Sequence, residues 1–469
     1  MNSPARRRAV LKVVNPFNQK TVCAFPWDGP AEIESKLESA RKAQARWSRL
    51  DVPERIRRIE SGLDYFRAHR DRIARDITVQ MGKPITQSRR EIDTFFERAR
   101  YMMSIAVKSL APDVMPARGG MSLRMEHVPL GVVLNIAAWN YPLLIPCNVV
   151  VPALLAGNTV LLKHSERTPL CGRHFERAFG RAGMPGLVTN LTTTHDATAR
   201  VISDPRVGFV AFTGSVRGGR QVYRKSARRI VDVGLELGGK DPAYVAEDAD
   251  MDFTVENVVD GACYNAGQSC CAVERVYVHR TRYDEFLQKA IPVLQRYRMG
   301  DPLEETTTMG PLARKSLPAE LGRRVKAAVS MGAEILLGGA RPRLAGNFFP
   351  PTLLANVPQA SRVMREESFG PIVPVKAVSG DAEAVRLMND SRYGLTASVW
   401  TRDRSRAEFF ARALDAGTVY QNRCDYLHPA LAWTGARDSG LGSTLSKYGF
   451  FHLTRRKNIH FRPAVWPKY

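Results

Sequence analysis

The sequence predicts an α/β protein with two doubly wound domains and a small β arm, and three patterns support this. From residue 130 to about 240, short apolar runs alternate with helical stretches. A second alternation of the same kind runs from about 241 to 430, and the tail 450–463 alternates apolar and basic residues. Strands that alternate with helices form parallel sheets. The 469 residues, of which 44% are hydrophobic, suffice for about two or three domains with buried cores.

The individual elements follow from the spacing of apolar residues. Helical periodicity predicts a helix over 31–47 and a second one that Pro53 opens and that continues through Phe66 and Ile73. Alternation of apolar and polar residues predicts a half-exposed strand over 122–129. In the first α/β segment we expect strands at 130–136, 159–162, 187–191 and 207–212, with helices near 143–155, 168–182, 196–203 and 219–226. In the second we expect strands at 274–279, 335–337, 373–377, 397–400 and 417–420.

The net charge of +23, from 69 Lys and Arg against 46 Asp and Glu, is the unusual feature of the composition. Such an excess suggests an anionic partner, such as nucleic acid, an acidic membrane surface or a phosphorylated or carboxylated ligand. The basic residues are scattered, however, and no block of about five or six like charges marks a binding tail. We therefore interpret the charge mainly as an arginine-rich composition on solvated faces, and we expect no specific nucleic-acid partner.

The uncharged run over 130–162 is long enough to resemble a membrane-spanning helix. It contains prolines and asparagines throughout, which would break such a helix and place polar groups in lipid, so we expect no transmembrane segment. The 7 cysteines form no CxxC pair, which argues against a disulfide framework and predicts a reducing, cytoplasmic location. The 9 histidines are isolated and no HExxH motif occurs, so we expect no metal site.

Three segments carry residues that suit covalent catalysis. Cys270 lies in a Gly-containing loop where a thiol can reach a substrate, although a free cysteine is more often a small buried residue. Glu236 lies at a strand end before a Gly-Gly turn; in an apolar setting it could act as a general base, and an exposed strand-end acid is the alternative. Asn140 lies in an apolar run, either as an oxyanion donor or as a turn-former before proline.

Taken together, these segments resemble the aldehyde dehydrogenase superfamily over nearly the whole chain. Each motif is weak alone, but all occur in the family's order with family-like spacing. They are WNYP at 139–142, LKHSE at 162–166, FTGS at 212–215, ELGGK at 236–240, GQSC at 267–270 and EESFGP at 366–371. The resemblance implies two Rossmann-type domains and an oligomerisation arm. The dinucleotide-binding domain would be 1–110 with 130–238, the domain of the nucleophilic cysteine 239–440, and the arm 111–129 with 441–469.

The resemblance also implies the reaction, which is oxidation of an aldehyde to a carboxylic acid with NAD(P)+. The Cys270 thiolate would attack the carbonyl, while the Asn140 side chain and the Cys270 backbone N–H hold the oxyanion. Loss of hydride to the nicotinamide would leave a thioester, and Glu236 would activate the water that hydrolyses it. Cys271 would be a bystander. This sequence of steps suits a reactive thiol paired with a redox cofactor.

Eight residues are implied as cofactor contacts by the same resemblance. Two would lie at the adenosine ribose, three near the pyrophosphate where Gly218 and Gly219 open a helix, and two at the nicotinamide ribose or packed beside it, while the eighth is a cofactor contact without an assigned position. In that order they are Lys163 and Glu166; Gly214, Ser215 and Gly219; Glu367 and Phe369; and Trp139. The Glu166 carboxylate should accept a ribose hydroxyl and repel a 2′-phosphate, which favours NAD. NADP is the alternative, because Lys163 and Arg167 could accommodate the phosphate.

The chain departs from the family pattern at several points, and one of them is the residue at a proposed proton-relay position. Many members carry a lysine, proposed to relay protons, on the helix after the Asn-Tyr-Pro motif, and the matching residue here is Val149. We expect the loop 421–426 and the helix around 143–148 to line the aldehyde tunnel. Arg423 could recognise a carboxylate, as a semialdehyde would require, and a surface arginine is the alternative. A homodimer or homotetramer is implied by the family alone.

An alternative hypothesis assigns the protein the same fold but a different class of function, in which the basic surface is the functional site. The protein would then bind nucleic acid or a membrane surface, with weak or lost catalysis. That hypothesis predicts steeply salt-dependent retention on DNA or heparin. The intact set of Cys270, Glu236 and Asn140 argues against it.

Overall fold

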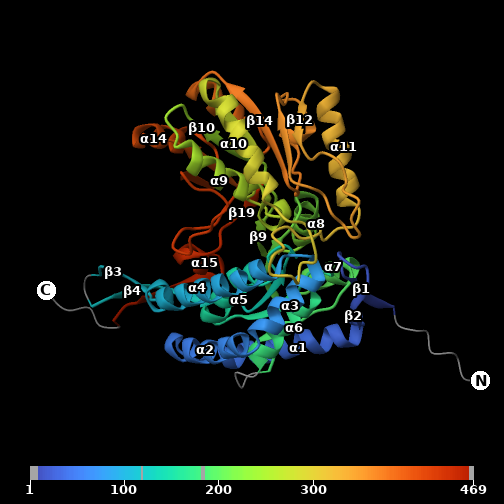
Figure 1. Ribbon diagram of the computed structural model, residues 1–469. Helices are drawn as coiled ribbons and strands as arrows, with labels where there is room; N and C mark the ends of the chain where they lie inside the picture. The colour runs from blue at the N-terminus through green and yellow to red at the C-terminus, as the bar shows by residue number, and fades with distance from the viewer. Residues whose placement is uncertain (1–8, 118–119, 181–184, 464–469) are drawn as a thin grey trace, which may run out of the picture.

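The computed structural model describes residues 9–117, 120–180 and 185–463, and it consists of two α/β domains with a β arm at one side (Figure 1). The first domain contains a six-stranded sheet in the order β19-β9-β8-β5-β6-β7. Its strands are parallel except for the short β19, which runs antiparallel to β9. The strands are β5 (Val132–Ile136), β6 (Thr159–Lys163), β7 (Val188–Asn190), β8 (Val207–Thr213), β9 (Asp232–Glu236) and β19 (Gly440–Leu441).

The helices of this domain form in the four stretches where βαβ rhythm predicts them. They are α5 (Leu144–Leu155), α6 (Pro169–Gly180), α7 (His195–Ile202) and α8 (Val216–Ser226). An N-terminal layer adds α1 (Pro30–Trp47), α2 (Val52–Ala68), α3 (Arg70–Met81) and α4 (Ile85–Ser109), after the hairpin of β1 (Val10–Val14) and β2 (Thr21–Pro26). The predicted single helix from Pro53 through Ile73 is wrong, because the chain breaks at His69, which ends α2 and caps α3.

The second domain contains a seven-stranded sheet in the order β12-β13-β14-β11-β10-β16-β17, parallel except for β12. Its strands are β10 (Asp241–Val245), β11 (Val273–His279), β12 (Glu334–Leu337), β13 (Thr352–Ala355), β14 (Ile372–Val378), β16 (Thr396–Trp400) and β17 (Thr418–Gln421). The main helices are α9 (Met251–Cys263), α10 (Tyr283–Gln295), α11 (Leu317–Ser330), α13 (Asp381–Asn389) and α14 (Arg404–Ala413). Strands β10 and β13 escaped prediction because both are short and buried along their whole length, so neither alternates.

The arm is a three-stranded antiparallel sheet in the order β20-β4-β3, which projects from the first domain in Figure 1. It consists of β3 (Asp113–Met115), β4 (Ser122–Pro129) and β20 (Thr454–Phe461), with α15 (Ser446–His452) leading into β20. The predicted strand over 122–129 is confirmed at both ends. The sheet thus joins the two segments that the sequence assigns to an arm.

The long uncharged run over 130–162 belongs to the buried core of the first domain and does not form a single apolar helix. It is divided into β5, α5 and β6, and every residue of these three elements is buried. A parallel sheet covered by helices on both faces needs strands without polar alternation. None of the helices in the described ranges is long and apolar enough to cross a membrane.

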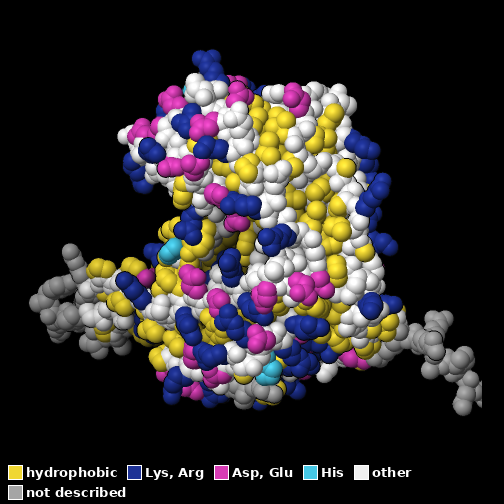
Figure 2. Space-filling model, in the orientation of Figure 1, with side chains coloured by type: hydrophobic (Ala, Val, Ile, Leu, Met, Phe, Trp, Pro, Cys, Tyr) yellow, Lys and Arg dark blue, Asp and Glu magenta, His cyan; other side chains and the backbone are white. Residues whose placement is uncertain are grey.

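The basic excess does not concentrate on the face seen in Figure 2, where Lys and Arg side chains lie among Asp and Glu side chains. Many of them form local ion pairs. Arg406, for example, contacts three carboxylates, those of Glu247, Asp248 and Asp381. This pattern agrees with the interpretation of the +23 charge as a property of solvated faces.

Candidate active site

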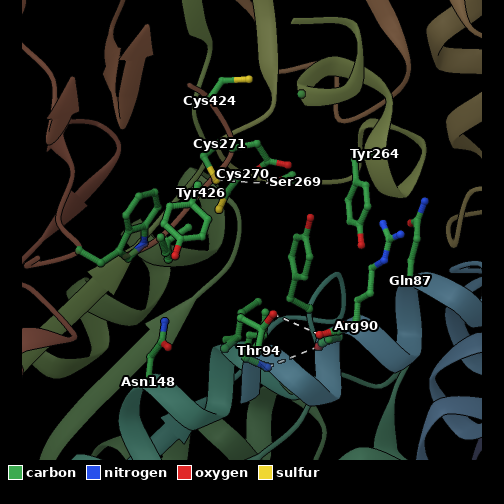
Figure 3. A pocket seen from close by; sticks show the side chains of 18 of the residues that line it. Gln87, Arg90, Thr94, Asn148, Tyr264, Ser269, Cys270, Cys271, Cys424 and Tyr426 are labelled. Carbon is green, nitrogen blue, oxygen red and sulfur yellow. Dashed lines mark hydrogen bonds between the residues drawn. The ribbon is translucent and has the colours of Figure 1, made fainter. Parts of the chain in front are cut away.

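A cavity of about 270 Å³ is enclosed by segments of both domains, and Figure 3 shows its interior. Helices α4 and α5 form one side, and the Cys270 loop, α9 and the loop after β17 form the other. A hollow between the two halves of the molecule is visible in Figure 2. Of the three residues predicted to be catalytic, Cys270 and Glu236 line this cavity. The predicted tunnel segments also line it, through Leu144, Ile145, Asn148, Cys424, Asp425 and Tyr426.

The loop that presents Cys270 has an unusual backbone. Between α9 and the cysteine, Asn265 and Ala266 both adopt left-handed φ angles of 52° and 55°. Gly267 follows with φ 69°, and a Cβ atom there would lie 2.4 Å from the carbonyl carbon of Gly370. Only glycine fits this approach, and non-glycine residues in the left-handed region cost roughly 1–2 kcal/mol each. Strain of this kind is typical of functional loops that their surroundings hold in place.

The asparagine pair Asn140 and Asn265 fastens this loop to the first domain. The Asn265 amide donates to the backbone oxygens of Asn140 and Gln268 at 3.1 and 3.2 Å. The Asn140 amide in turn donates to the Gln268 oxygen at 3.1 Å. Asn140 is 3% exposed, and the Gln268 oxygen that its side chain contacts lies two residues before Cys270 in the chain. The structure therefore bonds the predicted amide donor to the loop that carries the predicted thiol.

Glu236 ends β9 and faces the same cavity as Cys270. Burial raises the pKa of its carboxyl to about 7, against the lowering effects of a hydrogen bond from Thr444 and of the Arg98 charge. A carboxylate with a pKa near neutral can accept a proton from water and release it again at physiological pH. The predicted apolar setting for this glutamate is thus present.

Asp425 is a cavity residue that sequence reasoning did not single out. It accepts hydrogen bonds from the Ser269 hydroxyl at 2.7 Å and from the Cys271 thiol at 3.0 Å. Burial raises its pKa to about 6. Its φ of 44° is also left-handed, which is more common for aspartate than for most residues. Asp425 therefore holds the residues on both sides of Cys270, and only its position in the predicted tunnel loop could have indicated this.

Glu91 of α4, which lines the cavity, forms a buried ion pair with Lys83 of the α3–α4 turn. Both side chains are almost fully buried. The same glutamate accepts the backbone N–H of Leu143 at 2.8 Å, just before α5 begins. The Lys83 ammonium also lies 4.0 Å from the centre of the Tyr141 ring. Together these contacts fix the segment that follows Asn140.

A second cavity, of about 700 Å³, lies at the carboxyl end of the first domain's sheet. Four of the eight predicted cofactor contacts line it, namely Trp139, Lys163, Glu166 and Ser215. The Lys163 ammonium lies 3.9 Å from the Glu166 carboxylate. Burial lowers the pKa of Lys163, and Glu166 opposes that effect. A lysine, a carboxylate and a helix start at the edge of a parallel sheet fit a dinucleotide in the way that open α/β sheets generally do.

The start of α8 differs from the prediction that Gly218 and Gly219 open the helix. The helix begins at Val216, and the Ser215 hydroxyl caps it by accepting the Gly218 N–H at 3.2 Å. The Gly219 N–H is bonded to the Ser215 carbonyl at 2.9 Å, and a Cβ atom at Gly219 would lie 2.5 Å from a Leu237 methyl carbon. Gly219 therefore allows close packing of helix on strand. Ser215, with Gly214 preceding it, remains at the helix terminus.

Glu367, Phe369 and Trp139 meet near the junction of the domains. The Trp139 and Phe369 rings pack edge to face with centroids 5.5 Å apart. Glu367 accepts the Gly239 N–H at 3.3 Å, and burial raises its pKa to about 8. Glu274 fixes the backbone of this segment by accepting a hydrogen bond from the Phe369 N–H at 2.8 Å. Of the predicted contacts, these three thus share one region.

Cysteines outside the Cys270 loop have a different setting. All seven are free. Cys171, for example, is 0% exposed in the first domain's core, and burial raises the pKa of its thiol well above the usual value. No group of three or more His, Cys, Asp or Glu that could hold a metal occurs within the described ranges.

The fold and the site together define a class: a two-domain Rossmann-type oxidoreductase with a thiol and a carboxylate at one cavity and a buried amide bonded to the loop that presents the thiol. The model of the aldehyde dehydrogenase family matches residues 3–459. The chain is 37% identical to 3,6-anhydro-alpha-L-galactose dehydrogenase of Streptomyces coelicolor, covering 97% of this chain and 94% of that protein. It is 35% identical to the NADP+ succinate-semialdehyde dehydrogenase of Deinococcus radiodurans, covering 98% and 96%.

Among solved structures, an NAD-dependent aldehyde dehydrogenase from Sinorhizobium meliloti superposes with a TM-score of 0.94 at 33% identity, covering 98% of this chain and 93% of the other. The chain belongs to the aldehyde dehydrogenase family. The predicted family, the α/β fold with Rossmann-like domains and the activity, oxidation of an aldehyde with NAD(P)+, are therefore confirmed. The nucleic-acid or membrane alternative is not favoured.

Proposed function

We propose that Cys270 is the nucleophile of this aldehyde oxidation, that Asn140 stabilises the oxyanion and that Glu236 is the general base. One observation carries the proposal: Cys270 and Glu236 line one cavity, and the Asn140 side chain is bonded to the loop that presents the cysteine. Cys271 is 2% exposed and donates to Asp425, so it is turned into the structure as a support. Cys270 is the half-buried member of the pair.

The residues act in a definite order. The Cys270 sulfur adds to the aldehyde carbon, and the Asn140 amide, which in this structure donates to Gln268, donates to the oxygen that becomes negative. A bound nicotinamide cofactor supplies the hydride acceptor that this oxidation needs. Glu236 then takes a proton from water as the water oxygen adds to the thioester carbonyl carbon, and cleavage of the carbon–sulfur bond releases the carboxylic acid and the Cys270 thiolate. Its pKa of about 7 leaves a large part of it ionised at neutral pH.

For the cofactor, we propose the second cavity, with Lys163 and Glu166 toward the adenosine ribose, Ser215 and Gly214 toward the pyrophosphate, and Glu367 toward the nicotinamide ribose. The support is the lining of that cavity by Trp139, Lys163, Glu166 and Ser215, and the packing of the Trp139 ring on Phe369, two residues after Glu367. The Glu166 carboxylate favours NAD over NADP. Gly219 serves this region as a packing position and not through its own N–H.

The arm supports a homodimer or homotetramer. Its sheet leaves β3 and β20 as outer strands, and Val114 and Phe461 on them are 75% and 60% exposed. Exposed apolar edge strands pair readily with another chain. The free cysteines support the predicted cytoplasmic compartment.

The test of the proposed roles is NADH formation across a panel of aldehydes, followed by its absorbance. Wild-type protein should produce NADH, Cys270→Ala should produce none, and the matched control Cys271→Ala should retain most of the activity. Full activity in Cys270→Ala, or equal loss in both variants, would contradict the assignment of the nucleophile.

A further inference from the structure

Two basic side chains line the substrate cavity, Arg90 and Arg98, and neither forms an ion pair among the described residues. Four acidic residues line the cavity, and each has a donor within the protein. Glu91 pairs with Lys83, Glu236 accepts from Thr444, Asp260 accepts from Tyr297, and Asp425 accepts from Ser269 and Cys271. Of the two cations only Arg98 of α4 is buried, so it cannot keep its charge in water.

Arg98 is 6% exposed, which is unusual for an arginine without a carboxylate partner. Its Nη1 donates to the Asn148 side-chain oxygen at 3.1 Å. Its Nε finds no hydrogen-bond partner in the described parts of the chain. None of the ion pairs formed among the described residues includes Arg98. A buried guanidinium with an unused donor is costly, and an anionic ligand would offset that cost.

The position of Asn148 fixes the direction of this guanidinium. Asn148 comes from α5 and reaches into the cavity from the side opposite Cys270 in Figure 3. The amide oxygen holds one edge of the guanidinium, and the planar group can present its other N–H donors as a fork to a carboxylate. The thiol and the cation therefore lie in one cavity with space between them for a small molecule.

We infer that this cavity selects aldehydes that carry a carboxylate at the end remote from the aldehyde carbon, and that Arg98, positioned by Asn148, binds that carboxylate. The inference rests on the proposed function only in taking this cavity as the aldehyde site. Arg98 thus takes the place of Arg423 as the candidate residue for carboxylate recognition. Arg423 is exposed, lies 3.4 Å from the centre of the Tyr426 ring and is absent from the residues that line the cavity.

Arg90, the other basic residue of the lining, is exposed and can keep its charge in water. Arg90 can attract an anionic substrate toward the cavity but is less suited to binding its carboxylate, since a solvated guanidinium gains less binding free energy from an anion than a buried one does.

The kinetic test compares ω-carboxy aldehydes of about four to six carbons with n-alkanals of the same length. Wild-type enzyme should show a higher kcat/KM for at least one carboxy aldehyde than for its matched alkanal. The assay is run well above the acidic limb, where the loss of the Arg98 charge does not change the ionisation of Glu236. There Arg98→Met should reduce kcat/KM for that carboxy aldehyde by about 10- to 150-fold, the range for a hydrogen bond to a charged group, and should affect the alkanal much less. Arg98→Lys and Asn148→Ala should have smaller effects of the same kind, and Arg423→Met is the matched control with no effect.

Three outcomes would overturn the inference. One is a wild-type enzyme that prefers the alkanal throughout the series. A second is loss of the preference in Arg423→Met in place of Arg98→Met. The third is an equal loss for both substrate types in Arg98→Met with a displaced pH profile, which would mean that Arg98 acts through Glu236, whose pKa its charge lowers.

A binding measurement separates this inference from the catalytic roles. Cys270→Ala protein is titrated calorimetrically with succinate, which has two carboxylates, and with butanoate, which has one. Succinate should bind at least about 10-fold more tightly, and Arg98→Lys in the same background should reduce the difference. Equal binding of the two acids would overturn the inference even if Cys270 proves to be the nucleophile. Tighter binding of succinate would support it even if Cys270 proves not to be.

Discussion

The carboxylate of Glu236 accepts a hydrogen bond from the hydroxyl of Thr444, although 208 positions separate the two residues. Thr444 follows strand β19, which pairs with β9 and places Gly440 opposite Glu236. Burial raises the pKa of the glutamate to about 7, while the Thr444 hydrogen bond and the Arg98 charge lower it. A segment of the chain far from the glutamate therefore limits the rise that burial causes.

This relationship predicts the pH dependence of turnover. Glu236 acts as a base only when ionised, so kcat limited by thioester hydrolysis should fall as the pH falls through about 7. Thr444→Val removes a hydrogen bond that favours the ionised form, so the pKa rises and the acidic limb should move to higher pH. The profile is measured as kcat against pH with saturating aldehyde and NAD+. An acidic limb that stays in place in Thr444→Val would show that another group sets it.

Asn140→Ala should lower kcat by about 100- to 1000-fold, the usual cost of removing one oxyanion donor. The substitution also breaks the contact with Gln268, so near-ultraviolet circular dichroism should accompany the kinetics to show that the fold persists. A decrease below about 10-fold in a folded variant would remove Asn140 from the proposed mechanism.

Glu166→Gln should change the choice between the two cofactors. The carboxylate is partly exposed and lies 3.9 Å from Lys163, so its removal frees that ammonium and ends the repulsion of a 2′-phosphate. We expect the ratio of kcat/KM for NADP to that for NAD to rise roughly 10-fold, which corresponds to about 1.4 kcal/mol. An unchanged ratio would mean that the adenosine ribose lies elsewhere.

The Lys83–Glu91 pair should contribute strongly to stability, because both side chains are buried. Lys83→Met leaves the Glu91 charge buried without its partner, which should lower the free energy of unfolding by about 3–5 kcal/mol. Urea titration followed by fluorescence measures the change. Arg404→Ala, which breaks the exposed pair with Glu408, is the control and should cost no more than about 0.5 kcal/mol. Similar losses in the two variants would contradict the structural role of the buried pair.

Much of the fold follows from local patterns, and the misses have physical causes. The alternation of short apolar runs with helical stretches predicts β5 to β8 and α5 to α8 to within a few residues, because each element repeats one simple period. The break at His69 is invisible to periodicity, because the apolar positions on both sides of it continue. Strand β10 contains Pro242 and no alternation, so only its burial between β11 and β16 makes it a strand.

The residues of the site also divide into those that local sequence patterns predict and those that they do not. Cys270, Glu236 and Asn140 lie in short motifs, so the sequence predicts them individually. Thr444 and Arg98 reach the site through tertiary contacts, and nothing in their own neighbourhood along the chain distinguishes them. Asp425 is indicated only by its position in the predicted tunnel loop. Arg98 is the plainest case, since an arginine in an amphipathic helix is ordinarily a solvated residue. Its burial at 6% exposure depends on α5 packing against α4.

The most direct test of the proposed mechanism is to trap the intermediate in Glu236→Gln protein. This variant keeps the thiol but loses the base, so mixing it with an aldehyde and NAD+ should give one rapid burst of NADH and then slow turnover. Intact-mass spectrometry should show the added acyl group, and peptide mapping should place it on Cys270. Unimpaired steady turnover, or an acyl group on Cys271 or another cysteine, would contradict the account.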